Sequence, residues 1–102
     1  MILAAGRWSV SLLTAGQVPL AEHFANSGRD LATQFEGVPH RRGEVSGAAW
    51  IDGAAGWLDC VTETTVEAGD HTIVIGRVAA TETAPGDLAP LTHFRGGWGP
   101  RP

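Results

Sequence analysis

The segment that most constrains the fold of this chain is a short turn between two strand-forming runs. Residues 66–78 read Val-Glu-Ala-Gly-Asp-His-Thr-Ile-Val-Ile-Gly-Arg-Val, so a Gly-Asp pair precedes a strongly β-forming run. A glycine that can adopt positive φ is typical of the turn in a tight β-hairpin. The segment therefore predicts an antiparallel hairpin in which His71 leaves the turn at the edge of a sheet, where binding groups are common.

The remaining pattern predicts a mainly β fold with short helices and antiparallel strands. Pro19 near the start and Gly28 beyond the end predict an amphipathic helix over residues 17–26. Asp30 can cap a second helical turn that Gly37 ends. Strand runs separated by turn residues are expected at residues 8–13, 48–51, 55–65, 72–83 and 91–94.

The two longest runs contain apolar residues at nearly every position in Trp57–Val61 and Ile73–Ile75. This predicts that both faces of each strand are covered, as in a closed barrel with a helix outside. Trp8 and Trp57 lie inside strand runs and are expected in the core. Trp98 lies in a glycine-rich tail, where it could instead border a ligand pocket.

Composition excludes several classes of protein. The 102 residues form one domain, and no apolar stretch approaches the roughly 20 residues of a membrane span. The net charge is -4 and only Arg41 and Arg42 form a basic pair, so no nucleic-acid partner is expected. The single cysteine, Cys60, cannot form an internal disulfide, which favours a reducing, cytoplasmic location. The N-terminus lacks the basic segment of a signal peptide.

Familiar catalytic motifs are excluded by spacing. The four histidines are scattered along the chain, so no metal site is expected. Ser46 is one position too late in Gly43–Gly47 for the nucleophile elbow of a hydrolase. The chain has no lysine and no phosphate-binding glycine loop.

The residues alone leave two interpretations of the turn open. His71 is either a binding group or a polar residue at a strand end, and Asp70 is either part of that site or a turn residue that bonds its own backbone. Arg77 within the strand can simply reach solvent. For Trp98, a core role and a pocket role are equally supported.

A family resemblance adds information that the residues alone do not carry. Ala68–Val78 resembles the Gly-Asp-His signature of the flavin reductase-like family, whose members are FMN-binding split barrels. Further segments resemble the family in the same order along the chain: Gly6–Leu13, Leu20–Asp30, Phe35–Val38, Gly53–Cys60 and His93–Trp98.

The resemblance implies a reductase that transfers hydride from NADH or NADPH to FMN or FAD and supplies reduced flavin to a partner monooxygenase, as a homodimer. His71 would lie where the nicotinamide approaches the flavin ring. Gly69 would allow close approach of the backbone, and Asp70 would shape the turn. Arg95 and Trp98 match a closing segment of the family that borders the pocket.

Three departures from the family pattern modify this expectation. The aromatic residue at Trp98 is more commonly tyrosine, and Ser11 stands where asparagine is typical. In the family, the first barrel strands and the segments that hold the flavin precede the residues aligned with Met1. The single domain over residues 1–102 is therefore expected to be a partial split barrel without its N-terminal strands.

Two alternatives to an active reductase remain. The chain could be a non-catalytic split-barrel remnant or binding module. It could also be a small β-barrel that binds an unrelated ligand beside His71.

The partial barrel leads to a prediction for flavin binding. We expect the isolated 102-residue chain to bind FMN weakly and to purify without colour, because the expected barrel lacks the flavin-holding segments. Absorbance of the purified protein and a flavin titration measure this. A protein that is yellow as purified and oxidises NADH without added flavin would contradict the expectation.

Overall fold

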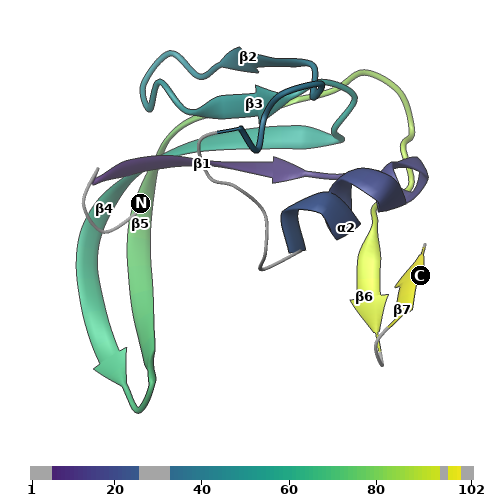
Figure 1. The fold of residues 1–102 in the computed structure, drawn as a ribbon. Coiled ribbons are helices and arrows are strands. Elements are labelled where there is room, and N and C mark those ends of the chain that lie inside the picture. The colour runs from purple at the N-terminus through teal and green to yellow at the C-terminus, as the bar shows by residue number, and fades with distance from the viewer. Residues whose placement is uncertain (1–5, 26–32, 95–96, 100–102) are drawn as a thin grey trace.

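The structure is a computed structural model that describes residues 6–25, 33–94 and 97–99 (Figure 1). Its strands form three antiparallel sheets, with the orders β1-β4-β5, β2-β3 and β6-β7. The elements are β1 (Arg7–Leu12), the 3-10 helix η1 (Ala15–Gln17), α2 (Val18–Ala25), β2 (His40–Arg42), β3 (Ala49–Ile51), β4 (Gly56–Ala68), β5 (His71–Thr83), β6 (Thr92–Phe94) and β7 (Gly97–Gly99).

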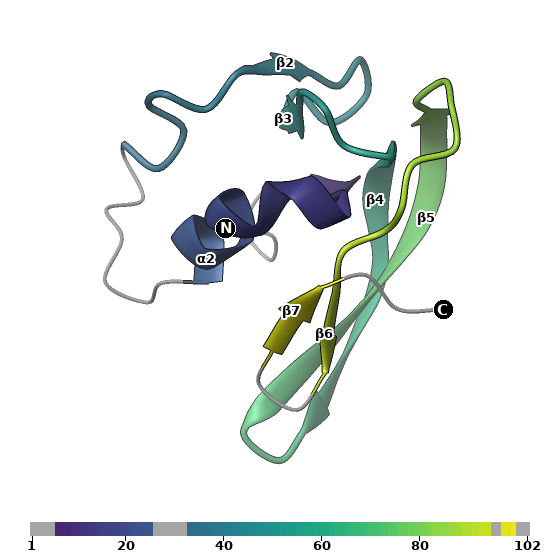
Figure 2. The same ribbon diagram turned by 90° about the vertical axis from the view of Figure 1, so that its right-hand side faces the viewer.

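Strand β4 is the centre of the largest sheet. Its first part pairs with β1, from Gly56 opposite Leu12 to Val61 opposite Arg7, while β5 follows it along its whole length. Starting from the Val61–Arg77 pair, which is the last to lie beside β1, β4 and β5 continue as a two-stranded extension, which we call the β4–β5 arm (residues 61–77). Figures 1 and 2 show the turn of this arm at one end of the molecule and the β2–β3 hairpin at the other.

Most of the predicted elements are confirmed. The five expected strands correspond to β1, β3, β4, β5 and β6, and the expected helix to η1 and α2. Gln17 Oε1 accepts a hydrogen bond from the Thr14 backbone N–H at 2.9 Å, which satisfies a donor at the start of the helical segment. Strands β2 and β7 were not predicted. The expected helical turn after Asp30 begins outside the described residues, and residues 33–37 form turns.

The expectation that both long strands are covered on both faces is wrong for β5. Ile73, Ile75 and Val78 keep 51%, 45% and 51% of their surface exposed. Ile73 and Ile75 lie in the arm, where β4 and β5 extend past the end of β1 and have no third strand beside them in the sheet. In the described ranges, β1 and β5 are the edges of the sheet and no strand joins them, so the expected closed barrel is not formed there.

The core lies between the β2–β3 hairpin and the first part of β4. The rings of Trp50 and Trp57 stack with centroids 5.7 Å apart and planes 3° from parallel, and Ala54 is fully buried beside them. The Trp57 Nε1–H group donates to the Ile51 carbonyl oxygen at 2.8 Å. Trp57 is thus in the core as predicted.

Trp8 is half-buried and packs across the sheet. Its Nε1–H group donates to Thr62 Oγ1 at 2.9 Å, and its indole ring covers Gly76 on β5. A Cβ atom at position 76 would clash with that ring and lie 3.3 Å from Cys60 Cβ. Residue 76 must therefore be glycine, because the Trp8 ring lies directly against the β5 backbone at this position.

Two serines of β1 connect the largest sheet to β3. Ser9 Oγ donates to the Ala49 carbonyl oxygen at 2.7 Å, and Ser11 Oγ accepts from the Ile51 N–H at 3.1 Å. These bonds satisfy backbone groups of β3 on the side away from β2. The serine at position 11 thus has a structural role.

Asp59 on β4 is fully buried and anchors the loop between β2 and β3. Its carboxylate accepts four hydrogen bonds, from the backbone N–H groups of Val45 (2.9 Å) and Ser46 (3.2 Å), from Ser46 Oγ (2.6 Å) and from Trp50 Nε1 (2.8 Å). Burial alone would raise the pKa of Asp59, but these hydrogen bonds outweigh it and lower the pKa below its usual value of 3.8. Burial, together with the charge of Asp59, raises the pKa of the neighbouring Cys60 thiol.

We expect the Asp59→Asn substitution to lower the free energy of unfolding by about 2 kcal/mol at neutral pH, because an amide group cannot accept all four donors. The folded-state pKa lies below the unfolded one, so the stabilisation is complete above pH 3.8 and is lost as the pH falls through the lower folded-state value. Urea unfolding of both proteins at several pH values measures the difference, with the exposed Asp87→Asn variant as control. An unfolding difference that does not shrink on acidification would contradict this account.

Candidate functional site

The predicted hairpin turn is present and consists of two residues. Strand β4 ends at Ala68 and β5 begins at His71, and these two residues pair directly across the turn. Gly69 has a φ angle of 63°, in the left-handed region that side chains disfavour. A two-residue turn with positive φ matches the right-handed twist of the flanking strands.

The turn presents a carboxylate and an imidazole to solvent. The side chains of Asp70 and His71 are 93% and 83% exposed, and His71 Nε2 lies 3.4 Å from Asp70 Oδ1. A contact this exposed contributes little to stability. Both groups are therefore accessible to a ligand.

The register places apolar residues on the same face as His71. Directly opposed residues share a face in an antiparallel pair, so Ala68 and His71, Val66 and Ile73, and Thr64 and Ile75 form one surface, which we call the His71 face. Val66 is 45% exposed, like the two isoleucines described above. The His71 face is thus an exposed apolar surface that ends in an imidazole.

The His71 face was not predicted from the sequence, although the signal was present. A two-residue turn that pairs residues 68 and 71 also pairs 66 with 73, and alternation then places both on one face. The continuous apolar run at Ile73–Ile75 instead suggested a strand covered on both sides. On the opposite face, Thr72 Oγ1 donates to Glu67 Oε1 at 3.1 Å.

The other predicted site residues lie near the C-terminus. Arg95 lies outside the described residues, and Trp98 is in β7, opposite His93 in the β6–β7 hairpin. Figure 1 shows this hairpin apart from the β4–β5 arm, although both project in the same direction from the rest of the chain in Figures 1 and 2. A shared pocket for Trp98 and His71 stays a prediction.

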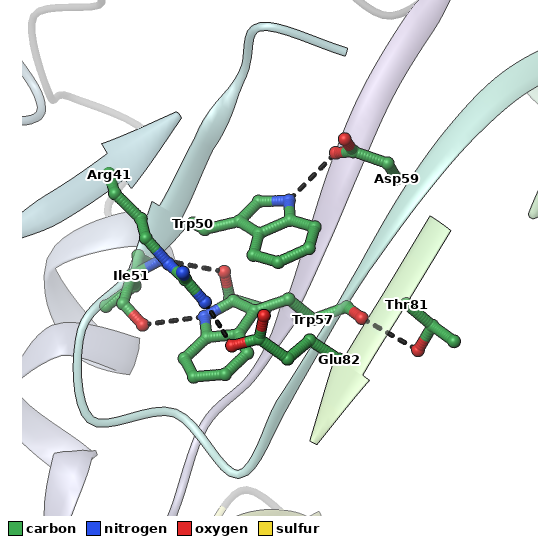
Figure 3. A network of polar contacts seen from close by, with 8 residues as sticks. Arg41, Trp50, Ile51, Trp57, Asp59, Thr81 and Glu82 are labelled. Carbon is green, nitrogen blue, oxygen red and sulfur yellow. Dashed lines mark hydrogen bonds and ion pairs between the residues drawn. The ribbon is translucent and has the colours of Figure 1, made fainter. Parts of the chain in front are cut away.

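A second polar cluster lies at the opposite end of the molecule from the turn. The Arg41 guanidinium lies 5.1 Å from the ring centroids of both Trp50 and Trp57 and forms an ion pair with Glu82 (Figure 3). Of these residues, Arg41, Trp50 and Glu82 border a groove of about 230 Å³ between β2, the following loop and the end of β5. The sequence showed Arg41–Arg42 as the only basic pair, but the proximity of Glu82 depends on the fold.

Within residues 6–25, 33–94 and 97–99, no three His, Cys, Asp or Glu side chains are grouped to hold a metal ion. No helix in those ranges has the length and apolar character needed to span a membrane.

Comparison with known proteins identifies the family. Residues 1–100 match the model of the flavin reductase like domain. The chain belongs to this family. It is 36% identical over 95 residues to a flavin reductase of Pseudomonas putida, covering 93% of this chain and 53% of that protein.

Two other similar proteins place this family member in context. The reductase subunit of a flavin-dependent monooxygenase of Mycobacterium tuberculosis is 31% identical over 96 residues, covering 93% of this chain and 49% of that protein. The solved structure of the NADH:FAD oxidoreductase of Streptomyces globisporus, in complex with NAD and FAD fragments, superposes with a TM-score of 0.86 at 36% identity, over 95% of this chain and 56% of that one. The chain spans about half the length of the curated relatives it matches. Its fold is that of the flavin reductase split barrels.

The geometry of the turn gives a testable prediction. We expect Gly69→Ala to lower the free energy of unfolding by about 1 kcal/mol, because an L side chain disfavours the observed φ of 63°. Gly16→Ala is the matched control. At both positions an added Cβ has no atom within 4 Å, but of these two glycines Gly69 has a positive φ and Gly16 does not. Equal effects of the two substitutions in urea unfolding would contradict the assigned turn.

Proposed function

We propose that the chain is an NAD(P)H-dependent flavin reductase that transfers reducing equivalents to FMN or FAD. The observation that carries the proposal is the match to the flavin reductase like domain over residues 1–100, together with an exposed Gly69-Asp70-His71 turn. Relatives named as flavin reductases and as an NADH:FAD oxidoreductase support the same chemistry.

The residues of the His71 face fit a planar ring system. Val66, Ile73 and Ile75 offer an exposed apolar surface, and His71 adds a nitrogen heterocycle that can donate or accept a hydrogen bond at its end. When bound, the flavin would accept a hydride from the nicotinamide, and this chemistry belongs to the cofactors. The protein's contribution is to bind and orient the rings.

Each residue of the turn has a proposed role in that orientation. Gly69 lets the chain reverse within two residues, so His71 is held at the first position of β5. Asp70, 3.4 Å from His71 Nε2, favours one orientation of the imidazole. We also propose that Arg95 and Trp98 border the cofactor site. For Trp98, which lies in β7, the shared direction of the β6–β7 hairpin and the β4–β5 arm supports this placement.

The partners of the proposed reductase follow from similar arguments. A flavin-dependent monooxygenase is the proposed recipient of reduced flavin, supported by the relative that is named as a monooxygenase reductase subunit. A homodimer is proposed because the His71 face leaves three large apolar side chains about half exposed. A cytoplasmic location is proposed from the single, buried Cys60.

The function is tested by NADH and NADPH oxidation with added FMN or FAD, measured over a series of flavin concentrations. We expect His71→Asn to lower kcat/KM for the nicotinamide about tenfold, equivalent to about 1.4 kcal/mol of transition-state stabilisation. Glu63→Gln, an exposed substitution on the same arm, is the control and should leave kcat/KM unchanged.

The outcomes separate the role of the residue from the function of the chain. Wild-type kcat/KM in His71→Asn would show that His71 does not orient the nicotinamide. A folded wild-type chain that oxidises neither NADH nor NADPH at any flavin concentration would favour the non-catalytic binding module.

A further inference from the structure

A charged groove lies at the end of the molecule opposite the His71 turn. It has a volume of about 230 Å³, and its walls come from β2 and the loop after it on one side and from the end of β5 on the other. We propose that this groove binds a small zwitterion that carries a carboxylate and an ammonium group, such as a free α-amino acid. The proposal is independent of the reductase function.

Two opposite charges line the groove without pairing with each other. Arg42 donates one hydrogen bond, to the Gly47 carbonyl oxygen at 2.7 Å, and contacts no carboxylate among the described residues. Glu44 is exposed, and its carboxylate has no hydrogen-bond or ion-pair partner in that part of the chain. A guanidinium has five donors, so most of those on Arg42 remain available to a ligand carboxylate.

The second charge pair in the groove can accommodate the same ligand class. Arg41 is paired with Glu82, but both side chains are 51% exposed, so the ion pair contributes little to stability. A zwitterion that separates the pair leaves neither group unpaired, because its carboxylate meets Arg41 and its ammonium meets Glu82. The cost of opening the pair is therefore small for a zwitterion.

A ligand with a single charge lacks this advantage. An anion that binds the two arginines also approaches the carboxylates of Glu44 and Glu82, and a cation that binds those carboxylates approaches the arginines. Like charges brought close together oppose binding in both cases. The balance of two positive and two negative groups thus selects a ligand that carries both signs.

The walls of the groove are held in place before a ligand arrives. Arg41 lies against the stacked indoles of Trp50 and Trp57 (Figure 3), which restricts its orientation without help from Glu82. Trp50 is in turn bonded to the buried Asp59 at 2.8 Å. Such pre-organisation reduces the loss of conformational entropy that accompanies ligand binding.

The groove also has an apolar portion beside its charges. Trp50 and Ala80 contribute to its lining. Trp50 is only 7% exposed, so this apolar surface is small and contacts part of the side chain on the α-carbon of the ligand. L-Phenylalanine is therefore the probe of choice.

The test is a titration of the 102-residue chain with L-phenylalanine, followed by calorimetry and by the NMR signals of the indole N–H groups. We expect saturable binding that shifts the Trp50 signal, and binding at least tenfold weaker for 3-phenylpropanoate and phenethylamine, which each carry one of the two charges. Arg42→Gln and Glu44→Gln should each weaken L-phenylalanine binding at least fivefold. Arg77→Gln and Glu63→Gln, on the β4–β5 arm, are the matched controls and should not change it.

Three results would overturn the proposal. These are no saturable binding of L-phenylalanine, equal binding of either singly charged analogue, or equal effects of the groove and arm substitutions. Urea unfolding of each variant shows whether it is folded. Should a groove variant not fold, the comparison of the three ligands on the wild-type chain decides the question by itself.

Discussion

The buried carboxylate of Asp59 is the interaction on which the rest of the described structure depends. It is fully buried, and its four hydrogen bonds gather the loop after β2, the side chain of Trp50 and strand β4 around one charge. Gly43 passes so close that a Cβ atom there would lie 2.5 Å from Asp59 Oδ2. Because a buried charge is costly unless its acceptor positions are satisfied, this network permits one arrangement of the loop.

The Trp50–Trp57 pair extends that arrangement to the surface. Trp50 bonds to Asp59 and stacks on Trp57, and both indoles support Arg41. The groove beside β5 is therefore built on the Asp59 network, although the charges that line it are exposed. A rigid support beneath flexible charged side chains is what a small ligand site requires.

The β4–β5 arm carries the proposed reductase chemistry at the other end of the molecule. Its length places His71 beyond the pairing region of β1, so the imidazole and the His71 face are exposed together. The same feature explains both the accessibility of the turn and the surface available to a second chain. Membership of the flavin reductase like domain family is the basis on which we propose reductase chemistry for this surface.

The sequence by itself determined the local features of this protein: the Gly69-Asp70 turn, five strands, the helix at Val18–Ala25, the family and the burial of Trp57. These features depend on turn-forming residues, hydrophobic periodicity and the order of motifs, all of which are local properties of the sequence. Only the tertiary structure decided that Asp59 is buried, that Arg41 meets Glu82, and that Ile73 and Ile75 are exposed. Each of these depends on where another element ends or on which distant residue lies opposite. An apolar run does not carry this information, because a covered strand and an uncovered strand can have the same composition.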